Sequence, residues 1–327
     1  MFVRSVFIIL FTIGISGGAY GQAAPKPTPP GSDQEQGPVT TFIRRVRLPI
    51  TVLDKKGRFI SGLTKGDFQI FEDKVPQEIE SFSDETDQNV QLYVGVLMDT
   101  SPSQAGKLRF EQEAAMNFIQ TVVRPRRDRV LFATFDDQIT LRQDFTDRLD
   151  LLDKAVNDVN KLGKQTALYD AVWQFCNEKM RSVTGRRVLV VITDGEDTYS
   201  RADMRNAVDI AQRTETTIFA ISTKAGLSSV VPGVEMGEVK DEKDRELLRL
   251  AEETGGTAFF VGDQVSLERS FTKVSHELRS QYLVTYKPTN DRYDGSYRKI
   301  SVKLASHNDL KIRTKQGYLA KADNVRP

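Results

Sequence analysis

The sequence contains few residues that could form covalent cross-links or nucleophilic centres. Cys176 is the only cysteine among 327 residues. The chain can therefore make no internal disulfide, and its fold must rely on a core or on a bound metal. His276 and His307 are the only histidines, and neither lies near a serine in a motif context, which argues against a Ser-His-Asp hydrolase. Cys176 falls within a predicted helix beside an apolar stripe, so we expect an inert, partly buried thiol rather than a nucleophile.

The chain also lacks an excess of charge of either sign. Without Arg4, which lies in the expected leader, the 46 Lys and Arg become 45 and equal the 45 Asp and Glu. Binding to nucleic acids or anionic membranes needs a basic surface, so this balance gives no support for a nucleic-acid partner. Hydrophobic residues make up 39% and charged residues 28% of the chain, which is typical of globular rather than disordered proteins.

The first forty residues are expected to be a leader and a linker. Residues 1–21 have the pattern of a signal peptide, with an apolar run at Val6–Ile15 and small residues at Ala19 and Gly21. This run is shorter than the about 20 residues that a spanning helix needs, and no other stretch qualifies. We therefore expect a secreted or periplasmic protein, which would contact a membrane only if the signal segment stayed uncleaved as an anchor. Residues 22–40 are rich in proline and polar residues and predict a flexible linker.

Two β-rich ends flank a middle region of different character. In residues 41–88 and again in residues 281–321, apolar residues alternate with polar ones, which is typical of half-buried strands. Lys74–Gln77 is predicted to be a turn within the first end. Neither end alone is long enough for a good core, so we expect the two to pack together as one small β-sandwich. The alternating residues are Val46, Leu48, Ile50, Val52, Phe68 and Ile70 in the first end, and Ile300, Val302 and Leu304 in the second.

The middle region, residues 89–280, predicts an α/β fold. Short and nearly unbroken apolar runs suit strands that are buried on both faces, and helical stripes separate most of them. This alternation favours a doubly wound, mostly parallel sheet inserted between the two β segments. Gln138–Phe145 follows the preceding run too closely for a crossover, so we expect an antiparallel edge hairpin there. The runs are Leu92–Met98, Val130–Phe135, Val188–Ile192, Thr217–Ile221 and Thr257–Val261; the helical stripes begin at Leu108, Leu149, Leu168 and Leu247, and a last helix is expected near Ser266–Arg279.

Polar loops follow two of these buried runs. The loop DTSPS at residues 99–103 follows the first run, the turn TDGED at residues 193–197 follows the third, and Thr166 opens a helix between them. Open α/β sheets bind ligands at the carboxyl ends of strands where the winding reverses. Carboxylate and hydroxyl oxygens suit Mg²⁺, Mn²⁺ or Ca²⁺ and do not suit zinc or copper. The side chains expected to converge on one such ion are Asp99, Ser101, Ser103, Thr166 and Asp194.

The loop residues determine what the ion could do. Serine and threonine hydroxyls are neutral ligands, so they leave much of the cation's charge uncompensated. An open coordination position then attracts an acidic group from outside. We therefore expect a protein partner that offers an Asp or Glu carboxylate to the metal.

The D-x-S-x-S loop, the later threonine and the T-D-G turn resemble the metal-ion-dependent adhesion site of the von Willebrand factor A/integrin I domain family. The resemblance implies a six-stranded sheet with one antiparallel edge. It implies Ser101 and Ser103 as direct ligands and Thr166 as a direct or water-bridged ligand, with Asp99 and Asp194 acting mainly through water. The flanking β segments resemble exported bacterial proteins with a related domain. The loop departs from the pattern in one detail, since Pro102 lies between the two serines and Gln104 follows them. Proline has a fixed φ and no N–H, which a loop that binds through hydroxyls should tolerate.

The expected function is an exported, cation-dependent protein-binding module that is not an enzyme. One alternative is a Mg²⁺-dependent phosphohydrolase with Asp99 as nucleophile, but position 101 offers no second acid and no phosphate-binding Gly-x-x-x-x-Gly-Lys loop occurs. A second alternative is a metal-free structural scaffold, against which the five matching positions argue. Asp136–Asp137 is interpreted as a hairpin turn rather than as a second cation site.

Overall fold

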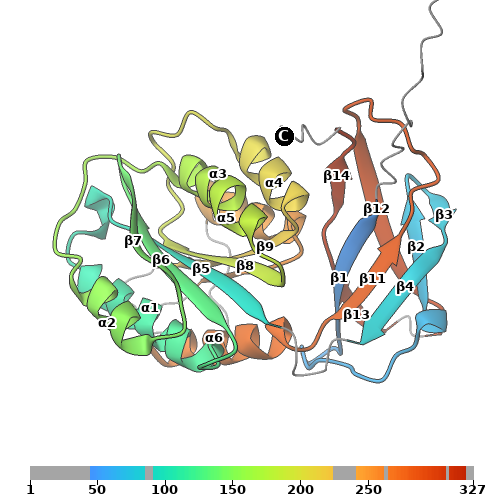
Figure 1. Ribbon diagram of the computed structural model, residues 1–327, viewed down its shortest axis with the longest axis horizontal. Coiled ribbons are helices and arrows are strands. Elements are labelled where there is room, and N and C mark those ends of the chain that lie inside the picture. Colours follow the sequence, from blue (N-terminus) through green and yellow to red (C-terminus); the bar gives the residue numbers. More distant parts are fainter. Residues whose placement is uncertain (1–44, 85–90, 224–240, 261–263, 307–308, 322–327) are drawn as a thin grey trace, which may run out of the picture. The chain divides into compact units, whose positions relative to one another are not determined.

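A six-stranded sheet forms the centre of the α/β part of the chain (Figure 1). The computed structural model describes residues 45–84, 91–223, 241–260, 264–306 and 309–321, so the expected signal peptide, the linker and His307 lie outside the described residues. The spatial order of the strands is β10-β9-β8-β5-β6-β7. All neighbours pair in parallel except β7, which runs antiparallel to β6 as the edge hairpin predicted. The strands are β5 (Leu92–Asp99), β6 (Arg129–Phe135), β7 (Ile139–Thr146), β8 (Arg186–Thr193), β9 (Thr216–Ser222) and β10 (Ala258–Phe260).

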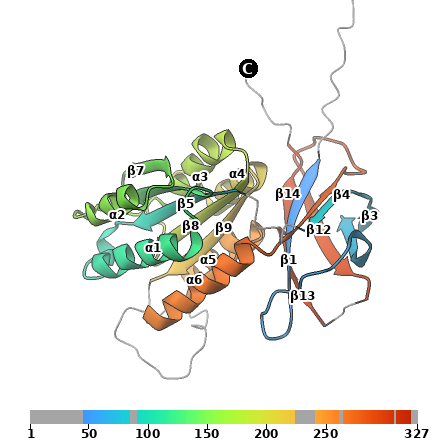
Figure 2. The ribbon, with the colours of Figure 1, turned by 60° about the horizontal axis from the view of Figure 1, so that its bottom comes forward.

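Helices cover both faces of this sheet (Figures 1 and 2). Side chains of α1, α2 and α6 share one apolar core with one face of the strands, and those of α3, α4 and α5 share a second core with the other face. Along β5, Val94 and Val96 belong to the first core and Leu97 to the second. The unbroken apolar runs therefore reflect strands that are buried from both sides. The helices are α1 (Leu108–Val122), α2 (Leu149–Asn157), α3 (Leu168–Glu178), α4 (Met204–Arg213), α5 (Glu242–Glu253) and α6 (Gln264–Leu278).

Eight strands from the two ends of the chain form a β-sandwich. One sheet has the order β13-β1-β11-β4 and the other β14-β12-β2-β3, so each combines N-terminal and C-terminal strands. Val46 pairs with Tyr286, for example, and Ile70 with Val302. The two sheets share one apolar core, which confirms that the ends pack together. The strands are β1 (Val46–Leu53), β2 (Phe68–Glu72), β3 (Val75–Gln77), β4 (Ile79–Asp84), β11 (Tyr282–Tyr286), β12 (Tyr297–Leu304), β13 (Lys311–Arg313) and β14 (Gly317–Leu319).

The structure corrects the sequence-based expectation in two places. The turn predicted at Lys74–Gln77 is wrong, because only Asp73 and Lys74 form the turn, with φ of 48° and 70°, and Val75–Gln77 is strand β3. Helix α4 was not among the predicted stripes, since its apolar face is short. Among the described residues, no helix is long and apolar enough to cross a membrane.

Candidate metal centre

The carboxyl ends of β5 and β8 lie side by side in the middle of the sheet. β5 ends at Asp99 and β8 at Thr193, and their parallel pairing aligns Met98 with Ile192. After β5 the chain continues to β6, which lies on one side of β5. After β8 it continues to β9, which lies on the opposite side of β8. Connections therefore leave in opposite directions between β5 and β8, which is where open α/β sheets form a ligand crevice.

Asp99 lies at the carboxyl end of β5, and both of its carboxylate oxygens accept hydrogen bonds. Its side chain is fully buried. The backbone N–H of Ser101 donates to Asp99 Oδ1 at 2.8 Å, and the Thr193 hydroxyl donates to Asp99 Oδ2 at 2.6 Å. The pKa of Asp99 is raised to about 6, chiefly by burial and in smaller part by the charge of Asp194, while the hydrogen bonds from Thr193 and Ser101 act in the opposite direction.

The two serines of the first loop bring their hydroxyls together. Their hydroxyl oxygens lie 2.9 Å apart, with Ser101 buried and Ser103 exposed. A short 3₁₀ turn, Pro102–Gln104, produces this spacing, with Ser101 at its N-cap position. Pro102 occupies the first position of the turn, where no backbone N–H is required. The departure from the family pattern therefore fits the local backbone and leaves both hydroxyls on one side.

Backbone hydrogen bonds connect the Thr166 loop to both other loops. The N–H of Gly163 donates to the carbonyl of Thr100 at 2.8 Å. The carbonyl of Thr166 accepts the N–H groups of Thr198 and Tyr199 at 2.9 Å each, and the Thr166 N–H donates to the Thr198 hydroxyl at 3.0 Å. The three loops therefore meet at one edge of the sheet, and Thr166 itself is buried there.

The structure connects the five predicted residues to one another to different degrees. Asp99, Ser101 and Ser103 are joined by direct hydrogen bonds. Asp194 follows Thr193, the residue that binds Asp99, and its charge acts on the pKa of Asp99. Thr166 is connected through the backbone of the other loops.

Asp136 and Asp137 hold loops together. The Thr100 hydroxyl donates to Asp136 at 2.7 Å, and the backbone N–H of Lys164 donates to Asp137, also at 2.7 Å. Asp136 also accepts the N–H of Gln138 within the β6–β7 turn at 2.8 Å. These contacts agree with the interpretation as a hairpin turn and additionally fix the Thr100 and Lys164 loops.

Sequence reasoning did not identify four buried polar residues that lie next to the loop with Asp99, Ser101 and Ser103. Thr193 is the hydrogen-bond donor to Asp99, while Gln104, Glu111 and Thr223 form a chain of contacts that begins at Ser103. Thr193 precedes Asp194 directly, so its position in the T-D-G turn was the available signal. Glu111 could have been noticed for a different reason, because it is a charged residue on the buried side of a helix.

The donor set fits a hard divalent cation. Every candidate donor is a hydroxyl or carboxylate oxygen, as Mg²⁺, Mn²⁺ and Ca²⁺ require. Buried carboxylates are costly without positive charge, and one oxygen of the buried Glu111, Oε2, has no hydrogen-bond partner. Within the described part of the chain, no group of three or more His, Cys, Asp or Glu is placed to hold a metal. A cation at this position would therefore have two aspartates and several hydroxyls as its candidate donors.

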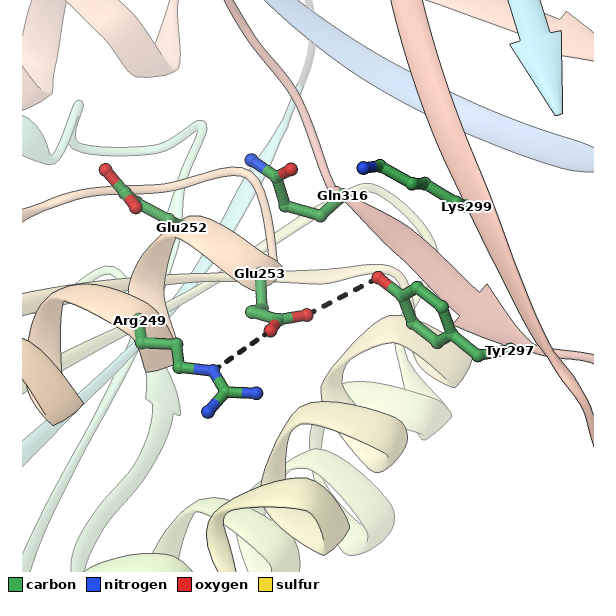
Figure 3. Close-up of a pocket in the computed structure, with 6 residues that line it drawn as sticks. All are labelled: Arg249, Glu252, Glu253, Tyr297, Lys299 and Gln316. Atoms are coloured by element: carbon green, nitrogen blue, oxygen red, sulfur yellow. Dashed lines mark hydrogen bonds and ion pairs between the residues drawn. The ribbon is translucent and has the colours of Figure 1, made fainter. Parts of the chain in front are cut away.

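A hollow of about 400 Å³ elsewhere in the described part of the chain contains none of these residues (Figure 3). Glu253 lies at its centre, where it accepts hydrogen bonds from Arg249 Nε at 3.2 Å and from the Tyr297 hydroxyl at 3.5 Å (Figure 3). Two acidic and two basic side chains line it, so their formal charges cancel. The lining residues are Arg249, Glu252, Glu253, Tyr297, Lys299 and Gln316.

Comparison with known proteins gives one family match and several structural likenesses. The model of the von Willebrand factor type A domain matches residues 94–273, more than half of the chain. None of the curated proteins matches the sequence.

Three solved structures illustrate the likenesses. An aerotolerance-related membrane protein from Bacteroides fragilis is 14% identical over 57% of this chain and 98% of that chain, with a TM-score of 0.46. The domain of a type V pilus tip protein from Porphyromonas gingivalis is 10% identical over 57% and 95%, with a TM-score of 0.44. Proximal thread matrix protein 1 from mussel byssus, solved with a zinc-occupied adhesion-site motif, is 14% identical over 63% and 48%, with a TM-score of 0.46, so this chain spans about half of that protein.

Proposed function

The chain belongs to the von Willebrand factor type A domain family, whose model it matches over residues 94–273, and on this premise we propose that it is a divalent-cation-dependent protein-binding module. The observation that carries the proposal is the contact of the Ser101 and Ser103 hydroxyls, 2.9 Å apart, in the loop whose backbone binds the buried Asp99. They lie where the sheet reverses its winding, next to the turn that contains Asp194.

Each residue has a distinct role in this proposal. Ser101 and Ser103 are direct ligands of Mg²⁺, or of Mn²⁺ or Ca²⁺ in its place, and Thr166 binds directly or through water. Asp99 and Asp194 act mainly through water, because Asp99 already uses both oxygens for hydrogen bonds. When bound, the cation offers an open position to a carboxylate of the partner. The exposed position of Ser103 supports access from outside.

The arrangement around Asp99 supports binding rather than catalysis. A phosphohydrolase of the alternative kind would need Asp99 as an accessible nucleophile. Asp99 is instead fully buried, with Oδ1 bound by the Ser101 N–H and Oδ2 by the Thr193 hydroxyl. Position 101 also provides a hydroxyl where such an enzyme would use an acid. We therefore propose that the module is not an enzyme.

Export and domain organisation belong to the same proposal. Residues 1–21 would direct the chain out of the cytoplasm, to a secreted or periplasmic location. The α/β module at residues 89–280 would be displayed on the sandwich formed by residues 41–88 and 281–321. The sequence pattern of the leader and the pairing of strands from both ends support these assignments.

Calorimetric titration with Mg²⁺ and Mn²⁺ tests the metal centre. We expect saturable binding by the wild-type chain and its loss in Ser101→Ala and in Ser103→Ala, because each variant removes one ligand. Ser301→Ala removes an exposed hydroxyl from β12 and should bind like the wild type. A wild-type chain that binds neither ion would instead support the metal-free scaffold.

Capture of partners tests the adhesion step. Proteins from the envelope fraction of the source cells should bind the immobilised wild-type chain in Mg²⁺ and be released by EDTA. The Ser101→Ala variant should not retain them in either condition. The same set of captured proteins with Mg²⁺ and with EDTA would contradict cation-mediated binding, and turnover of phosphate esters would favour the phosphohydrolase.

A further inference from the structure

Glu111 is a buried carboxylate that the proposed metal site does not use. It lies in the first turn of α1 and is fully buried. Its Oε1 accepts a hydrogen bond from the Thr223 hydroxyl at 2.8 Å, and its Oε2 has no hydrogen-bond partner. Isolated carboxylates are rarely buried, because losing water is costly unless positive charge or hydrogen bonds replace it. Glu111 therefore needs a reason other than core packing.

A chain of polar contacts leads from Glu111 to the exposed serine of the metal centre. The Thr223 hydroxyl also lies 3.5 Å from Gln104 Oε1, and Gln104 Nε2 donates to Ser103 Oγ at 3.4 Å. Gln104 and Thr223 are fully buried. The backbone N–H of Thr223 donates to the carbonyl of Thr193 at 3.0 Å. Glu111 is thus connected both to a proposed ligand and to the residue that binds Asp99.

The charges of the centre act on Glu111 in the same region. Burial raises the pKa of Glu111 well above its usual range, and the negative charges of Asp99 and Asp194 raise it further. Lys107 acts in the opposite direction, and so does the hydrogen bond from Thr223. When no cation is present, burial and repulsion by the two aspartates therefore disfavour the charged form of Glu111. A divalent ion at the serine pair would turn that repulsion into attraction.

We propose that Glu111 is an additional residue of the metal centre, which supplies negative charge behind the ligands and holds the Thr223 hydroxyl beside Gln104, the residue that donates to Ser103. This inference rests on the proposed function. Glu111 does not join the two aspartates in a cluster of direct ligands, so it acts at a distance and through its polar contacts. Residues that support metal ligands in this way typically contribute 10- to 100-fold to affinity.

The substitution Glu111→Gln separates this role from a purely structural one. Glutamine keeps an oxygen that can accept the Thr223 hydrogen bond but removes the charge. Calorimetric titration of the full chain at neutral pH should show Mg²⁺ and Mn²⁺ binding weakened by about 10-fold or more. In EDTA, the variant should unfold at the same or a higher urea concentration than the wild type, because a repelled carboxylate is gone. A purely structural role would leave cation affinity unchanged, and loss of the carboxylate would then lower stability in EDTA.

Two further variants complete the test. Glu111→Asp retains the charge and should recover part of the affinity lost in Glu111→Gln; equal losses in both would overturn a role for charge. Glu72→Gln is the matched control, since Glu72 is a buried carboxylate of β2 that accepts the Tyr286 and Tyr318 hydroxyls at 2.7 and 2.9 Å. It should leave cation affinity unchanged.

The outcomes distinguish this inference from the proposed function. A wild-type chain that binds no cation would overturn both. Cation binding by the wild type together with unchanged affinity in Glu111→Gln would overturn only the role of Glu111. A Glu111→Gln variant that is less stable than the wild type in EDTA would show that the carboxylate serves the fold, and would likewise overturn it.

Discussion

Replacing Asp99 by asparagine tests the electrostatics of the centre in the absence of metal. Asp99 is fully buried at the end of β5, and its pKa is raised to about 6 from 3.8, chiefly by burial. The folded state therefore holds this proton more tightly than the unfolded state. The tighter binding of this proton stabilises the folded state. That stabilisation is fully present below about pH 4 and is lost as the pH rises through about 6.

The size of this effect follows from the pKa difference. Each unit corresponds to about 1.4 kcal/mol, so a shift from 3.8 to about 6 corresponds to ~3 kcal/mol. Asparagine has no proton to lose, and the effect disappears in Asp99→Asn. In EDTA, the unfolding free energy of Asp99→Asn relative to the wild type should therefore increase by ~3 kcal/mol between about pH 4 and pH 7.

Urea unfolding followed by tryptophan fluorescence measures this difference. Trp173 is the only tryptophan and lies in α3, so it reports on the α/β part of the chain. Saturating Mg²⁺ at neutral pH should reverse the order, with the wild type more stable than Asp99→Asn. Asp153→Asn, which removes an exposed carboxylate from α2, controls for the loss of one negative charge. A difference between Asp99→Asn and the wild type that does not change with pH would refute the reasoning.

Three further predictions, two substitutions and one labelling experiment, concern the packing around the sheet and the sandwich. Gly256→Ala would place a Cβ 1.9 Å from the carbonyl oxygen of Ile218, so we expect a loss of at least about 3 kcal/mol in urea unfolding. Arg313→Met leaves the buried Glu277 without the ion pair that joins them at 2.6 Å, and should cost about 3 kcal/mol at pH 8 and less at pH 4. Cys176 is fully buried with its pKa raised to about 12, so it should react with a thiol reagent only after denaturation; rapid reaction in the native protein would show that the thiol is accessible.

The central sheet could be predicted from sequence because its strands are covered on both faces. An unbroken apolar run such as Val188–Ile192 follows directly from that environment. The antiparallel edge could be predicted from the short connection before β7. Helix α4 was harder to recognise, since its buried apolar side chains span only Ala207–Ala211. Its remaining signal was Asp203, whose side chain caps the helix by accepting the N–H of Asn206 at 2.8 Å.

The loops of the candidate site could be located from the sequence, but the hydrogen bonds between these loops and the residues packed against them could not be predicted. The loop patterns and the strand before each loop indicated Asp99 and Asp194. The bond between Thr193 and Asp99, by contrast, joins residues 94 positions apart, and the bond between Thr223 and Glu111 joins residues 112 positions apart. Such pairings depend on the register of neighbouring strands and on helix placement, which a single sequence does not specify.

The pairing of β4 with β11 has a consequence for how the protein is made. The hydroxyl of Tyr282 donates to the carbonyl of Ile60, 222 positions away, so the sandwich cannot be completed until the whole α/β segment has left the ribosome. Asp84 and Tyr282 lie opposite each other in that pair. Once the α/β segment has folded, its two ends are therefore neighbours, and it closes the sandwich at the entropic cost of a short loop rather than of a long flexible chain. Folding of the inserted segment thus prepares the late pairing of strands that were synthesised at opposite ends of the chain.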